Sequence, residues 1–197
     1  MKFWQHMVIT FSLLFPFVYG TDAFYGAMAF AVLGSVFPDV DVIEIREISS
    51  PLSRIMQAVK MILYYPISAV FSIMLFRNVT KHRGFAHTLL AAAIFSGILF
   101  LVFQYAGLNS EIAFFFFMGY CLHILEDCFT PSGTEPFLPL RTRIYGRIGT
   151  SSPLLIIIPF CFLAPVILFL FSYLSVENAK NLEMIMLAVF AMALKIS

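Results

Sequence analysis

Three of the four histidines in the chain lie in two short polar islands of an otherwise apolar sequence. These islands are Lys81–His87 and His123–Asp127, and a third island, Phe37–Asp41, adds the carboxylates Asp39 and Asp41. Ionisable groups at membrane depth are costly and usually serve a function. Since imidazoles and carboxylates are the ligands of hydrolytic metals, the islands predict a divalent-metal site between helices. Zinc is the first candidate, and manganese or magnesium are the alternatives.

Spacing indicates how the histidines would be presented. His123 and Asp127 are four residues apart, so they lie on one helical face about one turn apart. His82 and His87 are five apart and would diverge by about 140° on a continuous helix. They can converge only if His82 lies on a preceding turn, for which Gly84 could supply the bend.

The remaining charged residues of the islands have possible catalytic roles. Asp39 and Asp41 follow a proline in a stretch predicted to be extended or turn-like, where alternate residues point opposite ways. One of them should therefore reach a metal, while the other orients a ligand or binds a second ion. Arg83 is placed to hold an anionic group such as a phosphate. Glu126 lies about 100° from Asp127 around the helix, and is either a general base or an interfacial carboxylate.

Each residue also has a simpler interpretation. A single histidine at a membrane edge is usually a satisfied interfacial residue, and Asp39 and Asp41 could end a helix and enter a solvated loop. Arg83 alone is an ordinary cytoplasmic anchor. The joint pattern, with several imidazoles and carboxylates at helix ends, favours the metal site.

Composition predicts an all-α membrane protein with a single integral membrane domain over residues 1–197. Of the 197 residues, 61% are hydrophobic and only 12% are charged, which is too apolar for one aqueous core. The net charge of +1 makes nucleic acid an improbable partner, and membrane lipid is the expected one. The three cysteines are interpreted as small core residues: Cys121, Cys128 and Cys161.

About six spanning helices are expected, several of them shorter than the ~20 residues that a membrane crossing requires. They are Met7–Tyr19, Ala23–Phe37, Phe85–Tyr105, Glu111–Asp127, Pro153–Tyr173 and Leu182–Ile196. The N-terminal run resembles a signal peptide, but the apolar segment that follows favours retention of residues 1–20 as half of a hairpin. A further segment around residues 49–76 holds an apolar run that Pro66 should break.

The distribution of basic residues decides how this further segment lies. If it crosses the membrane, the twelve lysines and arginines divide into five and seven on the two faces. If it is interfacial or re-entrant, eleven share one face and only Lys180 lies opposite. The positive-inside rule selects the non-crossing arrangement, with this face and the N-terminus in the cytoplasm. The same arrangement brings the polar islands and His6 to one side.

Three strings resemble the YdjM-like family of bacterial inner-membrane proteins, which are described as candidate metal-dependent hydrolases. They are FPDVD, KHRGFAHTLL and GYCLHILEDCFTPSGTEPFLPLR, in the family's order and within about residues 1–150. The C-terminal helices, residues 153–197, lie beyond this similarity. The stretch between Asp41 and His82 is longer than the family's usual linker, and the residues around His87 and Glu135 differ slightly from the family pattern. The resemblance implies as metal ligands His6, Asp39, Asp41, His82, His87, His123 and Asp127.

Two main functions follow. The first is a metal-dependent hydrolase at the cytoplasmic face that acts on an ester or phosphoester of a lipid-like or membrane-proximal substrate. The second is a non-enzymatic membrane protein with a structural metal or lipid-headgroup site. A small transporter is a third possibility, disfavoured because no second ionisable cluster is expected on the opposite face. The oligomeric state, the substrate and the number of ions stay open.

Overall fold

The structure, a computed structural model, describes residues 3–42, 51–75, 83–149, 152, 154–171, 174–192 and 195–196. It is mostly helical, which confirms the predicted all-α class. Each of the six predicted apolar helices is present, with bounds that differ from the prediction by a few residues. They are α1 (Phe3–Val18), α2 (Phe24–Val36), α5 (Leu89–Tyr105), α6 (Ile112–Cys128), α7 (Leu154–Leu170) and α8 (Val176–Ala191).

The last predicted helix is wrong at both ends. Helix α8 begins six residues earlier than expected and ends at Ala191 rather than continuing to Ile196. Residues Lys195–Ile196 instead form β2, which pairs antiparallel with β1 (Ile144–Tyr145) in the loop before α7. Isoleucine and tyrosine favour such extended pairing, and the ladder joins the end of the chain to the basic loop.

Pro66 does not break the helical segment of residues 51–74. Helix α3 (Pro51–Val59) continues through a π-helical turn, η3 (Lys60–Tyr64), into α4 (Tyr65–Met74). A proline ring inside a regular helix clashes with the carbonyl four residues earlier. The wider π turn directly before Pro66 changes that spacing, and Pro66 itself occupies the first turn of α4.

The expected number of spanning helices is not confirmed. Among the described residues, Gln57–Met74 is the only helical stretch long and apolar enough to cross a membrane by length and composition. That stretch lies in the segment predicted not to cross. The six other apolar helices contain 13 to 17 residues each, fewer than the ~20 that a perpendicular crossing requires.

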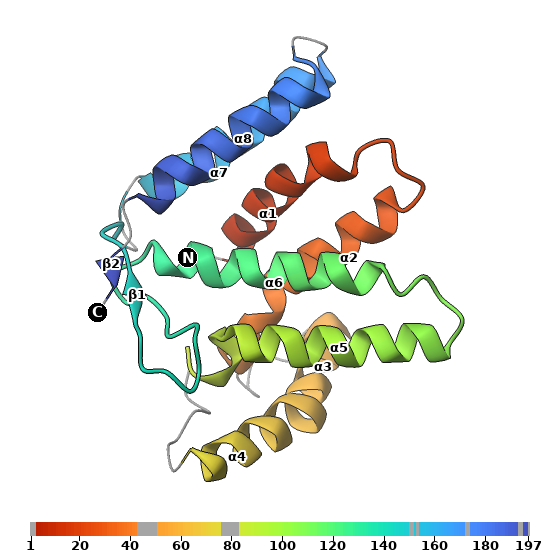
Figure 1. Ribbon diagram of the computed structural model, residues 1–197, viewed down its shortest axis with the longest axis vertical. Coiled ribbons are helices and arrows are strands. Elements are labelled where there is room, and N and C mark those ends of the chain that lie inside the picture. Colours follow the sequence, from red (N-terminus) through yellow and green to blue (C-terminus); the bar gives the residue numbers. More distant parts are fainter. Residues whose placement is uncertain are drawn as a thin grey trace.

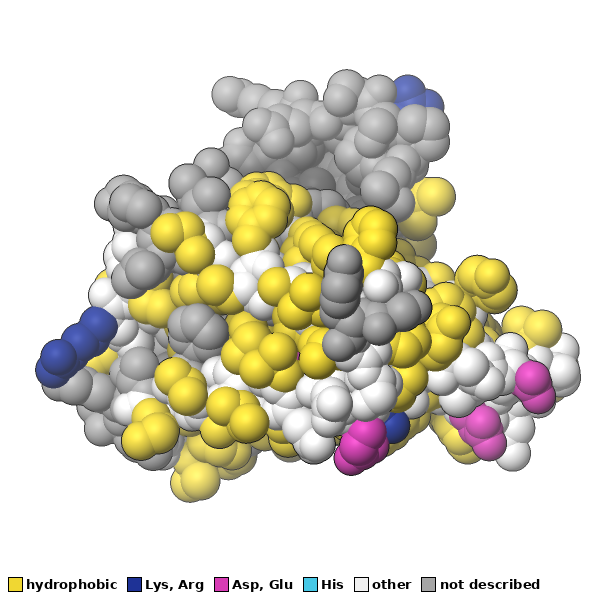
Figure 2. Space-filling model, turned by 90° about the horizontal axis from the view of Figure 1, so that it is seen from above, with side chains coloured by type: hydrophobic (Ala, Val, Ile, Leu, Met, Phe, Trp, Pro, Cys, Tyr) yellow, Lys and Arg dark blue, Asp and Glu magenta, His cyan; other side chains and the backbone are white. Residues whose placement is uncertain are grey.

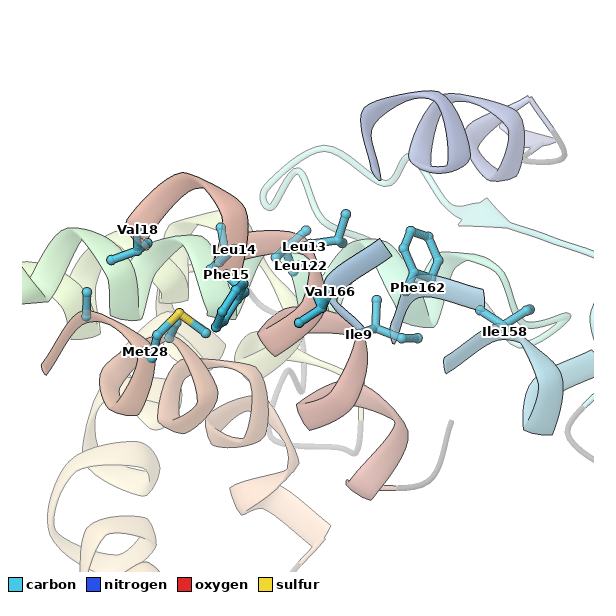
Figure 3. Close-up of a cluster of buried hydrophobic side chains, with 12 residues drawn as sticks. Ile9, Leu13, Leu14, Phe15, Val18, Met28, Leu122, Ile158, Phe162 and Val166 are labelled. Carbon is cyan, nitrogen blue, oxygen red and sulfur yellow. The ribbon is translucent and has the colours of Figure 1, made fainter. Parts of the chain in front are cut away.

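Helix α6 lies in the middle of the helical assembly, and α5 runs beside it in the opposite direction (Figure 1). Helices α1 and α2 pack on one side of α6, and α7 and α8 lie beyond α1. Strand β2, near the C-terminal end, lies beside β1 in the loop between α6 and α7 (Figure 1). One apolar core joins α1, α2, α6 and α7, and Figure 3 shows several of its side chains: Ile9, Phe15, Met28, Leu122, Phe162 and Val166.

The outer surface is also strongly apolar. In the view of Figure 2 hydrophobic side chains cover most of the described surface, and charged ones lie near its edges. Large side chains on α7 and α8 are exposed, among them Phe160, Phe171 and Ile185. Exposed apolar area of this extent is typical of a surface that faces lipid or another protein.

Candidate metal centre

A very close contact between two helices places His123. Gly34 on α2 and Gly119 on α6 lie where any side chain would collide with the facing backbone, since a Cβ on Gly119 would be 1.9 Å from the Ala31 carbonyl oxygen. This approach brings the Ser35 carbonyl oxygen within 2.6 Å of His123 Nδ1. A carbonyl can only accept, so Nδ1 carries the proton and His123 Nε2 keeps its lone pair.

His87 is positioned by a short 3₁₀ helix, η4 (Phe85–His87), and not by the long helix predicted from Phe85. Helix α5 starts only at Leu89 because Thr88 is extended and its hydroxyl caps the Ala91 amide at 3.1 Å. The Tyr120 hydroxyl donates to the Ala86 carbonyl at 2.6 Å, which ties η4 to α6. His87 is therefore held from both sides and is fully buried.

Asp39 lies in a second 3₁₀ helix, η1 (Phe37–Val42), directly after α2. Of the two predicted forms, extended or turn-like, the turn-like one is therefore confirmed. Residues two apart on a 3₁₀ helix also point in different directions, because each residue turns the chain by about 120°. Asp39 faces the histidines, with Oδ1 at 3.7 Å from both His87 Nε2 and His123 Nε2.

Donor atoms from η1, η4 and α6 lie close to one another around His123. His87 Nε2 and His123 Nε2 are 3.3 Å apart. Asp127 Oδ2 lies 3.5 Å from His87 Nε2 and 3.9 Å from His123 Nε2, and Asp39 Oδ1 closes the group. The metal-capable groups of the described residues are Asp39–His87–His123 and His6–His123–Asp127, so buried imidazoles and carboxylates here could hold an ion.

The distances suit a small divalent ion. Zinc–ligand bonds of about 2.0–2.1 Å in a tetrahedron place neighbouring donor atoms about 3.3 Å apart. The five separations just given run from 3.3 to 3.9 Å, which is close to this spacing. Two imidazoles and two carboxylates are also a donor set that zinc accepts, and manganese is compatible with it.

Electrostatics favour an ionised carboxylate at this place. Partial burial raises the pKa of the Asp39 carboxyl, but the adjoining His87, His123 and His6 imidazoles lower it more. The pKa of Asp39 therefore lies well below its usual range. A carboxylate that is charged at neutral pH is ready to bind a cation without first losing a proton.

His6 and Glu126 form a buried pair beside the four donor atoms. Because α1 begins at Phe3 and not at Met7, His6 is a helical residue that faces α6. His6 Nδ1 and Glu126 Oε2 share a hydrogen bond at 2.7 Å, and the His6 ring stacks on His123 with centroids 3.9 Å apart. His6 Nε2 lies 3.7 Å from Asp127 Oδ1. Glu126 is 2% exposed, so its interpretation as an interfacial carboxylate is wrong.

Arg83 connects the centre to the loop after α6. Its Nε lies 3.3 Å from Asp127 Oδ2, and Nη1 donates to Thr130 Oγ1 at 3.1 Å and to the Ser132 hydroxyl. The backbone bend predicted at Gly84 occurs at Arg83, whose φ is +61°. This left-handed conformation is uncommon for a residue with a side chain and aims Arg83 toward the loop.

The structure thus brings together most of the predicted site residues. His6, Asp39, His87, His123 and Asp127 form two overlapping groups that share His123, and Arg83 and Glu126 lie beside them. His82 lies outside the described residues, and for Asp41 the structure describes the backbone but not the side chain. Sequence reasoning missed three partners because their roles come from backbone or loop geometry: Ser35, Thr130 and Ser132.

Comparison with known proteins gives one finding. No curated protein and no solved structure matches the chain. The family model of the YdjM inner membrane protein matches residues 1–197. The similarity expected over about residues 1–150 therefore extends through the C-terminal helices α7 and α8. Because this match covers the whole chain, the chain belongs to the YdjM inner membrane protein family.

Proposed function

We propose that the protein is a metal-dependent hydrolase of the inner membrane that cleaves an ester or phosphoester of a lipid-like or membrane-proximal substrate. The observation that carries the proposal is the set of donor atoms of His87, His123, Asp39 and Asp127, which face one another at 3.3 to 3.9 Å. When bound, a divalent ion such as zinc acts as a Lewis acid and activates water as a nucleophile at neutral pH.

The chain's own residues have separate tasks in this proposal. His87, His123, Asp39 and Asp127 hold the ion, and the Ser35 carbonyl fixes the His123 tautomer. Glu126 orients His6, whose Nε2 points to the centre and is available to accept or return a proton. His6 also remains a candidate ligand, because it belongs to the second metal-capable group.

The centre is proposed to open toward the cytoplasmic face. Asp39 and His87 flank the segment that holds α3 and α4, yet their side chains are 3.7 Å apart. The two flanks therefore meet on one side, which supports an interfacial or re-entrant segment over a single crossing. Short helices α1, α2 and α5 to α8 would then span by local thinning of the bilayer, with the N-terminus in the cytoplasm.

A structural metal site is the second candidate, and burial favours it. His87 and His123 are fully buried, and structural zinc sites are closed by four protein ligands. Asp39, with a quarter of its side chain exposed, and Arg83 are the solvent-facing members that a substrate would approach. A lipid-headgroup site without chemistry is the related alternative.

Metal analysis tests the proposal directly. Detergent-purified protein should contain about one divalent ion per chain, and His123→Ala should lose it because His123 belongs to both metal-capable groups. Ser96→Ala is the matched control, since it changes a buried polar residue on α5 outside the centre. Wild-type protein without an ion, or full occupancy in His123→Ala, would refute the metal centre. Zinc- or manganese-dependent turnover of ester and phosphoester substrates separates the enzyme from the structural alternative.

A further inference from the structure

An acidic residue lies in the apolar contact between the last helix and the rest of the protein. Glu183 is on α8, and its side chain is fully buried. It shares one face of α8 with Ala179, one turn earlier, and with Met186 and Leu187, one turn later. Ala179 is buried, and Met186 and Leu187 pack against the core cluster of α1, α2, α6 and α7. Glu183 therefore points into this contact and not to the outer surface.

The carboxyl group of Glu183 has no hydrogen-bond partner among the residues that the structure describes, at either oxygen. The nearest cation along α8 does not supply one. Lys180 is three residues earlier, but its Nζ lies over the Phe17 ring of α1, 5.5 Å from the ring centroid. A carboxyl group that is buried without a partner in an apolar contact is unusual, because each unpaired polar atom there lowers stability.

The helices packed against α8 offer Glu183 no counter-charge. Helix α8 packs on α1 and α7. The titratable residue of α1 is His6, which lies at the candidate metal centre, and that of α7 is the exposed Cys161. The other charged residues of α8 are Lys180 and Glu177, which is exposed in the first turn. A negative charge at Glu183 would therefore be buried without compensation, which costs far more than burial of the neutral acid.

We propose that Glu183 is a proton-binding site, which holds its proton while α8 is packed against α1 and α7 and releases α8 when it loses that proton. The proton is the ligand because it alone removes the charge from the buried carboxyl group. The contact should therefore contribute stability at the pH values where Glu183 is neutral, and this contribution is lost as the pH rises and the acid ionises. The inference uses no residue of the metal centre and goes beyond the proposed function.

A hydrophobic carbodiimide tests the protonation directly. Dicyclohexylcarbodiimide adds across the O–H of a protonated carboxyl group: the proton goes to one nitrogen, the oxygen bonds to the central carbon and nothing leaves. The labelled peptide of the detergent-purified protein therefore gains the whole mass of the reagent. We expect Glu183 to be labelled, with a yield that falls about 10-fold for each pH unit once the residue ionises. Glu177→Gln, which changes an exposed carboxyl group of the same helix, should leave this yield unchanged.

Hydrogen exchange of α8 tests its release. Glu183→Gln has the shape of the neutral acid and cannot ionise. At a pH of about 6, the α8 amides should therefore be equally protected in this variant and in wild type. At a pH of about 10, wild type should be about 10-fold or more less protected than the variant. Comparison of the two proteins at each pH cancels the intrinsic pH dependence of exchange. If Glu183→Gln fails to fold, Glu183→Leu takes its place, because its side chain suits an apolar contact.

The outcomes decide the two parts of the proposal separately. Absence of label on Glu183 at low pH, or a yield that does not change with pH, would overturn the proton site. Protection of Glu183 from the reagent by sodium chloride, but not by choline chloride, would also overturn it, since the ligand would then be a metal cation. Equal protection of α8 in wild type and Glu183→Gln at every pH would overturn the release of α8. None of these measurements depends on metal content, so failure of the metal centre would leave them intact.

Discussion

Replacing Gly119 with alanine should disrupt the metal centre although Gly119 is not itself one of the proposed ligands. The new Cβ would lie 1.9 Å from the Ala31 carbonyl oxygen, whereas ordinary contacts begin at 3.4 Å. Helices α2 and α6 would have to separate by about 1.5 Å or distort locally. The same movement would stretch the 2.6 Å hydrogen bond from His123 Nδ1 to the Ser35 carbonyl beyond hydrogen-bond range.

Two costs follow from this movement. Overpacking of a tight contact costs about 1–3 kcal/mol, and loss of the hydrogen bond adds about 0.5–1.5 kcal/mol to the fall in unfolding free energy. For a chain of this length that corresponds to a melting temperature lower by roughly 5–15 °C. Loss of the hydrogen bond that orients a metal-binding imidazole should also weaken metal affinity by about 10- to 100-fold.

Gly97→Ala is the matched control for this experiment. Gly97 is also a helical glycine, on α5, but a Cβ there would meet nothing within 4 Å. Alanine should therefore be tolerated or even stabilise the helix by about 0.5–1 kcal/mol. Thermal unfolding and metal content of both detergent-purified variants would be measured side by side. If Gly119→Ala behaved like Gly97→Ala in both assays, the backbone contact could not be what positions His123.

Three further predictions concern other parts of the molecule. Tyr120→Phe should lower the unfolding free energy by about 1–2 kcal/mol and reduce metal content, because the Tyr120 hydroxyl holds the Ala86 carbonyl next to His87. An unchanged melting temperature and metal content would contradict this. In EDTA-treated protein, the difference in unfolding free energy between wild type and Asp39→Asn should be constant above the pKa of an unfolded aspartate, about 3.9. It should shrink as the pH falls below that value toward the lowered pKa of Asp39 in the folded protein. Denaturant unfolding measures this difference, and a decline already at pH 6 would argue against a lowered pKa. Reporter fusions after residues 47, 83 and 143 should all give cytoplasmic signals, and a cytoplasmic signal at 47 with a periplasmic one at 83 would mean that Gln57–Met74 crosses.

The polar islands were predictable because an apolar chain must gather its charged groups away from lipid. The spacing of His123 and Asp127 already put both side chains on one helical face, and the structure has them there. The assembly of Asp39 and His87 with them follows from the same cost of isolated charges in an apolar medium. The sequence therefore predicts which groups meet but not the contacts that align them.

The alignment itself depends on packing that no local pattern reveals. In the sequence Gly119 is an ordinary small residue, and only the structure shows that it packs against Ala31 of α2. Glu126 looks peripheral in the sequence, and only the structure shows that α1 brings His6 into contact with it. The continuation of the helix through Pro66 depends on a π turn, and β2 depends on a partner strand about fifty residues earlier. These features are tertiary, so propensity and periodicity carry little information about them.

The hydrogen bond from His123 to Ser35 also limits how many ions the centre can hold. Both metal-capable groups include His123, and its Nδ1 is committed to a carbonyl, so only Nε2 remains to bind a metal. One lone pair cannot serve two cations. The Asp39–His87 side and the His6–Asp127 side can therefore share only one ion through His123. A second ion in the centre would need a set of ligands that leaves His123 out.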